Sequence, residues 1–166
     1  AYNLGIKAGI TTSDDLFEEK EKIKTFLKEG YIPEDERWNK EKIDSFCSPA
    51  SFMPEGKSII MAALCYYEED NMPSDEPFGE IALYTVRNNY RFLRKKLQKL
   101  VKFINTYMPG NFKIFVNGPL AEKPLAVRAG LGFYGKNSVV YTEEYGSRVI
   151  LGGIITDLEL PVDKPS

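Results

Sequence analysis

The chain has 166 residues and a net charge of −2, and 43% of its residues are hydrophobic while 28% are charged. This composition is typical of one globular domain and excludes an intrinsically disordered chain. Because the net charge is close to zero, binding to nucleic acid would need a local basic patch rather than an overall attraction.

The first predicted element is a helix that Ser13 or Asp14 caps and that Gly30 ends. A connection rich in proline and charge follows over residues 32–54. Residues 57–67 form a nearly continuous apolar run, which predicts a central strand buried on both faces.

The chain has two cysteines and no histidine. Cys65 lies inside the apolar run and is expected to be a buried, reduced thiol, whereas Cys47 is expected in a loop. This set cannot build a four-cysteine or cysteine–histidine zinc site or hold an iron–sulfur cluster, so no metal site is expected within these residues. No apolar run reaches the ~18 residues of a membrane span, and we expect a cytoplasmic protein without membrane contact. The acidic residues 68–77 predict a solvated surface loop.

Residues 88–108 give the strongest helical pattern, because apolar side chains recur at helical spacing along one face. These side chains belong to Tyr90, Leu93, Leu97, Leu100, Val101 and Ile104. The opposite face is basic and carries Arg87, Arg91, Arg94, Lys95, Lys99 and Lys102. A basic face of this kind is either a solvated surface or a contact for a phosphate backbone or an acidic neighbouring domain, and both alternatives stay open.

The last third of the chain predicts short elements. Residues 112–116 favour a strand, and residues 122–129 favour a short helix. The alternating segments 137–141 and 147–156 predict two strands joined as a hairpin. With the central strand at 57–67, these elements predict an α/β (α+β) domain with a central mixed sheet flanked by helices.

A window rich in glycine lies between the short helix and the following strand. It contains Gly130, Gly132, Gly135, Lys136, Asn137 and Ser138. Glycine allows a ligand to approach the main chain closely, and exposed N–H groups beside a lysine favour an anionic or amide-rich ligand. These six residues are therefore predicted to bind a cofactor. The alternative is a tight connection in which Gly130 ends the helix, which requires only one or two glycines.

Further segments along the whole chain belong, together with this window, to one recognisable sequence pattern. They are Leu4-Gly5-Ile6, Gly9-Ile10, Pro54-Glu55-Gly56-Lys57-Ser58-Ile59-Ile60, Pro119, Glu122-Lys123-Pro124-Leu125-Ala126, Arg128-Ala129-Gly130-Leu131-Gly132, Gly135-Lys136-Asn137 and Gly146-Ser147. With them the chain resembles the epoxyqueuosine reductase family, the cobalamin-dependent iron–sulfur enzymes that catalyse the last step of queuosine synthesis in tRNA.

The resemblance implies that residues 1–166 form a single cobalamin-binding domain, similar to corrinoid-binding reductase cores. It also implies a Cys-rich domain with two [4Fe-4S] clusters downstream. Ala1 and the ending Asp163-Lys164-Pro165-Ser166 suggest a fragment of a longer chain. We expect this fragment alone to be inactive.

The chain departs from the family pattern where protons would be handled. The family has an aspartate, its presumed proton donor, just before the position of Pro119, and this chain has Val116-Asn117 there. An asparagine can hydrogen-bond a substrate but cannot serve as a general acid near neutral pH. By resemblance, Asn117, Tyr90 and Lys123 are the candidate catalytic residues on the substrate side. The departures predict little epoxide reduction by the full-length protein.

Two classes of function therefore compete. The first is a corrinoid-dependent iron–sulfur oxidoreductase that acts on queuosine in tRNA. The second is a divergent electron-transfer module that binds a corrinoid or another cofactor without reducing epoxides. The partner of the basic helix face, Arg91 to Lys102, is either tRNA or the ferredoxin-like domain that would follow this chain.

Overall fold

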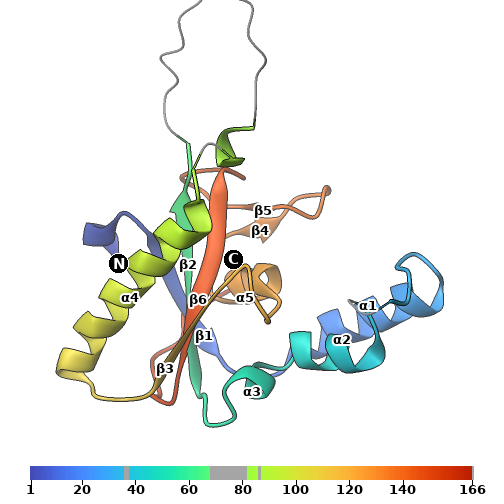
Figure 1. Cartoon of the computed structure of the whole chain (residues 1–166), viewed down its shortest axis with the longest axis horizontal. Helices are drawn as coiled ribbons and strands as arrows, with labels where there is room; N and C mark the ends of the chain where they lie inside the picture. The colour runs from blue at the N-terminus through green and yellow to red at the C-terminus, as the bar shows by residue number, and fades with distance from the viewer. Residues whose placement is uncertain (36–37, 68–81, 86, 166) are drawn as a thin grey trace, which may run out of the picture.

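A four-stranded antiparallel sheet forms the centre of the molecule (Figure 1). The computed structural model describes residues 1–35, 38–67, 82–85 and 87–165, so the predicted acidic loop at 68–77 lies outside the described residues. The strands are β1 (Lys7–Thr12), β2 (Ser58–Cys65), β3 (Phe112–Val116) and β6 (Val149–Thr156), in the order β1-β2-β6-β3. The α+β class is confirmed, but all three strand pairs are antiparallel, so the sheet is not mixed.

Helices and a small hairpin complete the described chain. The helices are α1 (Phe17–Lys28), α2 (Lys40–Phe46), α3 (Pro49–Phe52), α4 (Asn89–Tyr107) and α5 (Glu122–Arg128), with single 3-10 turns at Tyr2–Leu4 and Leu83–Thr85. The hairpin pairs β4 (Phe133–Tyr134) with β5 (Val140–Tyr141). No described helix is both long enough and apolar enough to cross a membrane.

Strand β2 is buried on both faces, as its apolar run predicts. Successive side chains of a strand point to opposite faces, so the strand contributes to two cores. Ile59, Met61 and Ala63 pack in one core with Leu125 of α5. Ile60, Ala62 and Leu64 pack in the other, with buried leucines of α4. Helices α4 and α5 therefore cover opposite faces of the sheet.

Helix α4 confirms the strongest sequence prediction. Leu93, Leu97 and Leu100 are buried against the sheet. The helix begins where the Asn88 side chain accepts a hydrogen bond from the backbone N–H of Arg91 at 2.9 Å, which is an N-cap contact. Tyr90 differs from the prediction, because it lies on the exposed side of the first turn rather than in the apolar face.

Helices α1 and α2 extend beyond one end of the sheet (Figure 1). Two ion pairs join them, from Lys20 and Lys24 to Asp44 at 2.9 and 3.0 Å. The predicted N-cap of α1 is wrong. Helix α1 begins after Leu16 with no side-chain cap, while the Ser13 hydroxyl donates to Gly56 O. The short helices α2 and α3 lie in the connection of residues 32–54, which is rich in proline and charge.

The predicted hairpin of residues 137–141 with 147–156 is also wrong. Residues 140–141 pair with β4, and β6 pairs with β2 and β3. The pattern of alternation was correct, but a strand's partner depends on residues distant in sequence.

The two cysteines exchange the roles that local sequence predicted. Cys47 is fully buried, and burial raises the pKa of its thiol to about 11. Cys65 is only partly buried, because it ends β2 at the rim of the sheet.

Both edge strands of the sheet are engaged along their outer sides. At β1, Ile10 exchanges hydrogen bonds with Asp163: its N–H donates to the carboxylate at 2.8 Å, and its carbonyl accepts from the Asp163 N–H at 2.9 Å. At β3, the Arg94 guanidinium of α4 donates to Ile114 O at 3.2 Å.

Candidate active site

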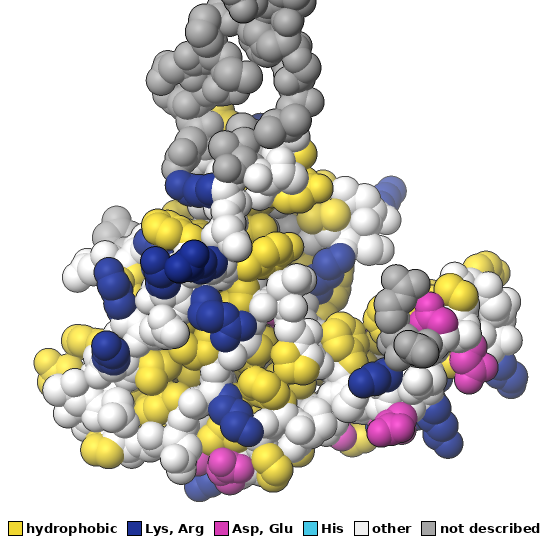
Figure 2. Space-filling model, viewed as in Figure 1, with side chains coloured by type: hydrophobic (Ala, Val, Ile, Leu, Met, Phe, Trp, Pro, Cys, Tyr) yellow, Lys and Arg dark blue, Asp and Glu magenta, His cyan; other side chains and the backbone are white. Residues whose placement is uncertain are grey.

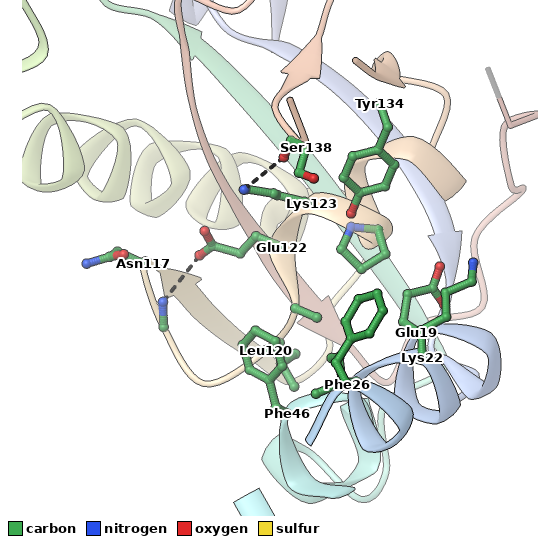
Figure 3. A pocket seen from close by; sticks show the side chains of 14 residues that line it. Glu19, Lys22, Phe26, Phe46, Asn117, Leu120, Glu122, Lys123, Tyr134 and Ser138 are labelled. Atoms are coloured by element: carbon green, nitrogen blue, oxygen red, sulfur yellow. Dashed lines mark hydrogen bonds between the residues drawn. The ribbon is translucent and has the colours of Figure 1, made fainter. Parts of the chain in front are cut away.

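A cavity of about 570 Å³ lies between α1 and the start of α5 (Figure 3). Helix α1 forms one wall of the cavity. None of its residues is fully buried, and the side chains that line the cavity lie on one side of this helix. The backbone N–H of Ala121 donates to Phe46 O at 3.0 Å, which fixes α2 against the loop that precedes α5. The lining residues are Glu19, Lys22, Ile23, Phe26, Phe46, Asn117, Gly118, Leu120, Ala121, Glu122, Lys123, Pro124, Tyr134 and Ser138.

Two residues with unusual backbone conformation line this cavity. Among the described residues, Asn117 and Ser138 are the non-glycine residues with positive φ, at 49° and 60°. This conformation is uncommon for residues other than glycine, although asparagine adopts it more readily than serine, and it is enriched at functional sites. Their coincidence in one cavity marks it as the candidate site.

Each of these two residues positions a charged side chain of α5. Next to Asn117, the N–H of Gly118 donates to the Glu122 carboxylate at 3.3 Å, and the backbone of Asn117 also hydrogen-bonds this carboxylate. The Lys123 ammonium donates to Ser138 O at 3.0 Å. Figure 3 shows both contacts as dashed lines at the top of the cavity. Adjacent residues of one helix thus hold the β3–α5 loop and the β4–β5 turn.

Glu122 has the most perturbed carboxyl group in the cavity. Burial raises the pKa of Glu122 to about 7, against the opposing effects of the Gly118 and Asn117 N–H groups and the charge of Arg94. At neutral pH this group is therefore close to half protonated. The sequence prediction missed it, although Glu122 stands in the quoted motif, because its desolvation depends on the tertiary fold and leaves no local signal.

Tyr134 supplies a second polar group from β4. Burial, followed by the charge of Glu19, raises the pKa of the Tyr134 phenol to about 12. The phenol therefore stays protonated across the physiological range and acts as a hydrogen-bond donor or acceptor rather than as an acid.

The glycines of the predicted cofactor window have packing partners inside the chain. Gly130 has φ of 71° and ends α5, with its N–H donating to Val127 O and that of Leu131 donating to Ala126 O, both at 3.0 Å. These bonds form the cap that glycine favours at a helix end, which confirms the alternative interpretation of Gly130. A Cβ at Gly132 would lie 2.1 Å from Tyr141 O, and one at Gly135 would lie 2.4 Å from the Tyr141 ring.

The structure gathers some predicted site residues and separates others. Asn117, Lys123 and Ser138 line the same cavity. Asn137 closes the β4–β5 turn, donating to the Tyr141 hydroxyl at 3.2 Å and accepting from Val139 N at 3.2 Å. Lys136 is exposed at this turn. Tyr90 does not line the cavity, because it belongs to the first turn of α4 on the other face of the sheet.

The fold belongs to a class shared by reductases. A reductive dehalogenase whose structure suggests a mechanism for B12-dependent dehalogenation matches 99% of this chain and 19% of its own. Its TM-score is 0.54 and its sequence identity 16%, so this likeness shows the fold alone.

Epoxyqueuosine reductases match in sequence as well. The family model described as epoxyqueuosine reductase QueG, DUF1730, matches residues 47–117. The Escherichia coli enzyme is 30% identical over 174 residues, covering 98% of this chain and 44% of its own length. The solved Streptococcus thermophilus enzyme has a TM-score of 0.87 and 30% identity, over 100% of this chain and 46% of its own. This chain belongs to the epoxyqueuosine reductase family, and it spans about half the length of these relatives.

Proposed function

We propose that this chain forms the part of a reductase that binds epoxyqueuosine in tRNA together with a corrinoid. The observation that carries the proposal is the cavity in which the backbones of Asn117 and Ser138, both with positive φ, hold Glu122 and Lys123. Family membership supports the reaction, and a solved epoxyqueuosine reductase has been crystallised with an epoxyqueuosine-modified tRNA-Tyr stem loop. The chain alone is expected to be inactive, because the proposed electron donors, [4Fe-4S] clusters, would lie in a further domain. The proposed location is the cytoplasm.

The reaction sets clear requirements for the residues of the cavity. Reduction of an epoxide to an alkene consumes two electrons and two protons and releases water. A bound corrinoid would supply the reducing chemistry, while protein groups bind, orient and exclude water. The Asn117 amide can donate to or accept from a substrate, and the Phe26 and Phe46 rings give the cavity an apolar wall.

The residues at the β4–β5 turn fit an amide-rich planar cofactor. Phe133 is 58% exposed and stacks on Tyr141, which leaves a flat apolar surface. The exposed Lys136 ammonium has no hydrogen bond or ion pair among the described contacts, so it is free to donate to a ligand. We propose that Lys136, Asn137 and Ser138 hold the corrinoid. Gly130, Gly132 and Gly135 would act indirectly, by shaping this turn.

A reconstitution experiment tests the proposed function. The full-length protein is expected to change the absorption spectrum of added cobalamin. With a low-potential reductant it is expected to convert an epoxyqueuosine stem loop to queuosine, in contrast to the little epoxide reduction that the sequence departures alone predict. An unmodified stem loop provides the control for background reaction. A full-length protein that leaves the cobalamin spectrum unchanged and forms no queuosine would contradict the proposal.

A binding or electron-transfer module remains the second candidate function. The observation that favours it is Asn117, an amide at the cavity where the family pattern would place a carboxylic acid nearby. This candidate predicts the spectral change of bound cobalamin without any formation of queuosine. The same reconstitution therefore separates the two functions.

The basic face of α4 is the proposed tRNA contact. Figure 2 shows Lys and Arg side chains gathered where α4 lies. Among the described residues the ion pairs lie within α1 or join it to α2, so none neutralises Lys95, Lys99 or Lys102. Arg94 connects this face to the cavity, because its charge acts on Glu122 while its guanidinium contacts β3.

Salt dependence tests this contact. In the full-length protein, replacing both Lys95 and Lys99 with alanine is expected to weaken binding of a tRNA stem loop. It should also lower the slope of log Kd against log salt by roughly one to two, because fewer counterions are released. The control is the double replacement of Lys28 and Lys40, which removes the same charge from the exposed surface of α1 and α2. An unchanged slope would instead indicate that the face contacts the ferredoxin-like domain.

A further inference from the structure

The carboxyl group of Glu122 lies where an acid can reach a substrate in the cavity. Glu122 is the first residue of α5, and its side chain extends towards Asn117, as Figure 3 shows. Of the two carboxylic acids that line the cavity, Glu19 lies on the wall formed by α1, and Glu122 lies beside Asn117 and Lys123.

From this geometry, and resting on the proposed function, we infer that Glu122 is the catalytic acid that protonates the oxygen leaving the epoxide. Neither Val116 nor Asn117, which stand just before Pro119, supplies a carboxylic acid. Glu122, at the start of α5, brings a carboxylic acid to the same loop, where it accepts a hydrogen bond from the Gly118 N–H.

None of the charged groups around Glu122 forms an ion pair with its carboxyl among the described contacts. Lys123, its neighbour, donates to Ser138 O and not to the Glu122 carboxyl. Arg94 of α4 acts on Glu122 through charge alone, without an ion pair among the described contacts. Glu19 and Lys22 reach the cavity from α1, and Tyr134 reaches it from β4. The Glu122 side chain is thus partly buried without a paired cation, and its desolvation favours the protonated form more strongly than the Gly118 and Asn117 N–H groups favour the charged form.

The proton and electron balance of the step is complete. A bound corrinoid and a low-potential iron–sulfur donor would supply the two electrons, and both C–O bonds of the epoxide break as the C=C bond forms. The O–H bond of Glu122 breaks, and its proton goes to the leaving oxygen. A second proton from solvent completes the water molecule, and solvent then reprotonates the Glu122 carboxylate. A pKa of about 7 suits this cycle, because the group both holds and releases a proton near neutral pH.

Glu122→Gln in the full-length protein tests the inference, because the amide keeps the shape but has no acidic proton. We expect kcat for the epoxyqueuosine stem loop to fall by ~100- to 10,000-fold, the usual range for a lost general acid. The absorption of bound cobalamin and the affinity for the stem loop should stay at wild-type values. Wild-type kcat should fall as the pH rises through about 7, and Glu122→Gln should lack this inflection. Glu55→Gln, which changes an exposed carboxylate, is the matched control.

Each outcome separates this inference from the function on which it rests. If the wild type is active and Glu122→Gln keeps its kcat and pH profile, the inference is overturned while the proposed function stands. If the wild type binds cobalamin but forms no queuosine, both are overturned. If Glu122→Gln does not fold, Glu122→Asp decides. Glu122→Asp keeps a carboxylic acid on a side chain one methylene shorter, which changes its surroundings. A shift in the pH at which kcat falls supports the inference, and an unchanged pH overturns it.

Discussion

Gly132→Ala is expected to destabilise the domain by at least ~1–3 kcal/mol, the usual cost of overpacking a core. A Cβ at this position would lie 2.1 Å from the carbonyl oxygen and 2.8 Å from the carbonyl carbon of Tyr141. Both contacts are with backbone, so β5 itself must move. Gly9→Ala is expected to act similarly, because its Cβ would lie 2.0 Å from Ala129 O at the end of α5. Urea unfolding followed by circular dichroism measures both effects.

Gly118→Ala is the matched control for these variants. Its Cβ would meet no atom closer than 3.5 Å, which is ordinary van der Waals contact. Its unfolding free energy should therefore stay close to the wild-type value. Wild-type stability in Gly132→Ala would show that the hairpin can move at little cost. Because the glycine variants change stability, Lys136→Ala is the better test of cofactor binding. Losing this one exposed charged contact should weaken the free energy of cofactor binding by an amount on the order of 1 kcal/mol.

The stability of the domain is expected to fall between pH ~4.5 and about 7 through Glu122. In the unfolded chain a glutamate titrates near ~4.3, whereas burial raises the pKa of Glu122 to about 7 in the folded state. The folded state therefore holds the proton more tightly. Its contribution to stability is fully present below the unfolded pKa and is lost as pH rises through the folded pKa. The total change is on the order of 3 kcal/mol.

The difference in unfolding free energy between the wild type and Glu122→Gln isolates this contribution. The difference should decrease from pH 4 to pH 8, because other titrating groups are common to both proteins. Glu55→Gln, whose side chain is exposed, should give a flat difference. A flat difference for Glu122→Gln would show that its carboxyl titrates alike in both states.

Elements with a strong local pattern could be predicted from the sequence. Helix α4 was predicted almost to its ends, because its apolar face has helical spacing. Strand β2 was predicted because it is apolar on both faces. Strand β1 was not predicted, since only its pairing with β2 makes Lys7–Thr12 extended. The strand partner predicted for residues 140–141 was also wrong, because strand pairing is a tertiary property.

The candidate site could be predicted in part. Asn117, Lys123 and Ser138 were selected from motifs, and they line one cavity. The role of the glycines was less predictable, because their neighbours, Tyr141 and Lys164, are set by the fold. Glu122 was missed as an acid because its burial depends on elements far apart in the chain.

The contacts along the outer sides of β1 and β3 bear on how this protein behaves at high concentration. An open strand edge offers free N–H and C=O groups to another molecule and so promotes aggregation. Asp163 occupies such groups at Ile10, and its carboxylate places a negative charge on that edge. Arg94 occupies the carbonyl of Ile114 and places a positive charge on the other. A copy of the sheet that approached either edge at these residues would have to displace a charged side chain, which disfavours strand-to-strand association there.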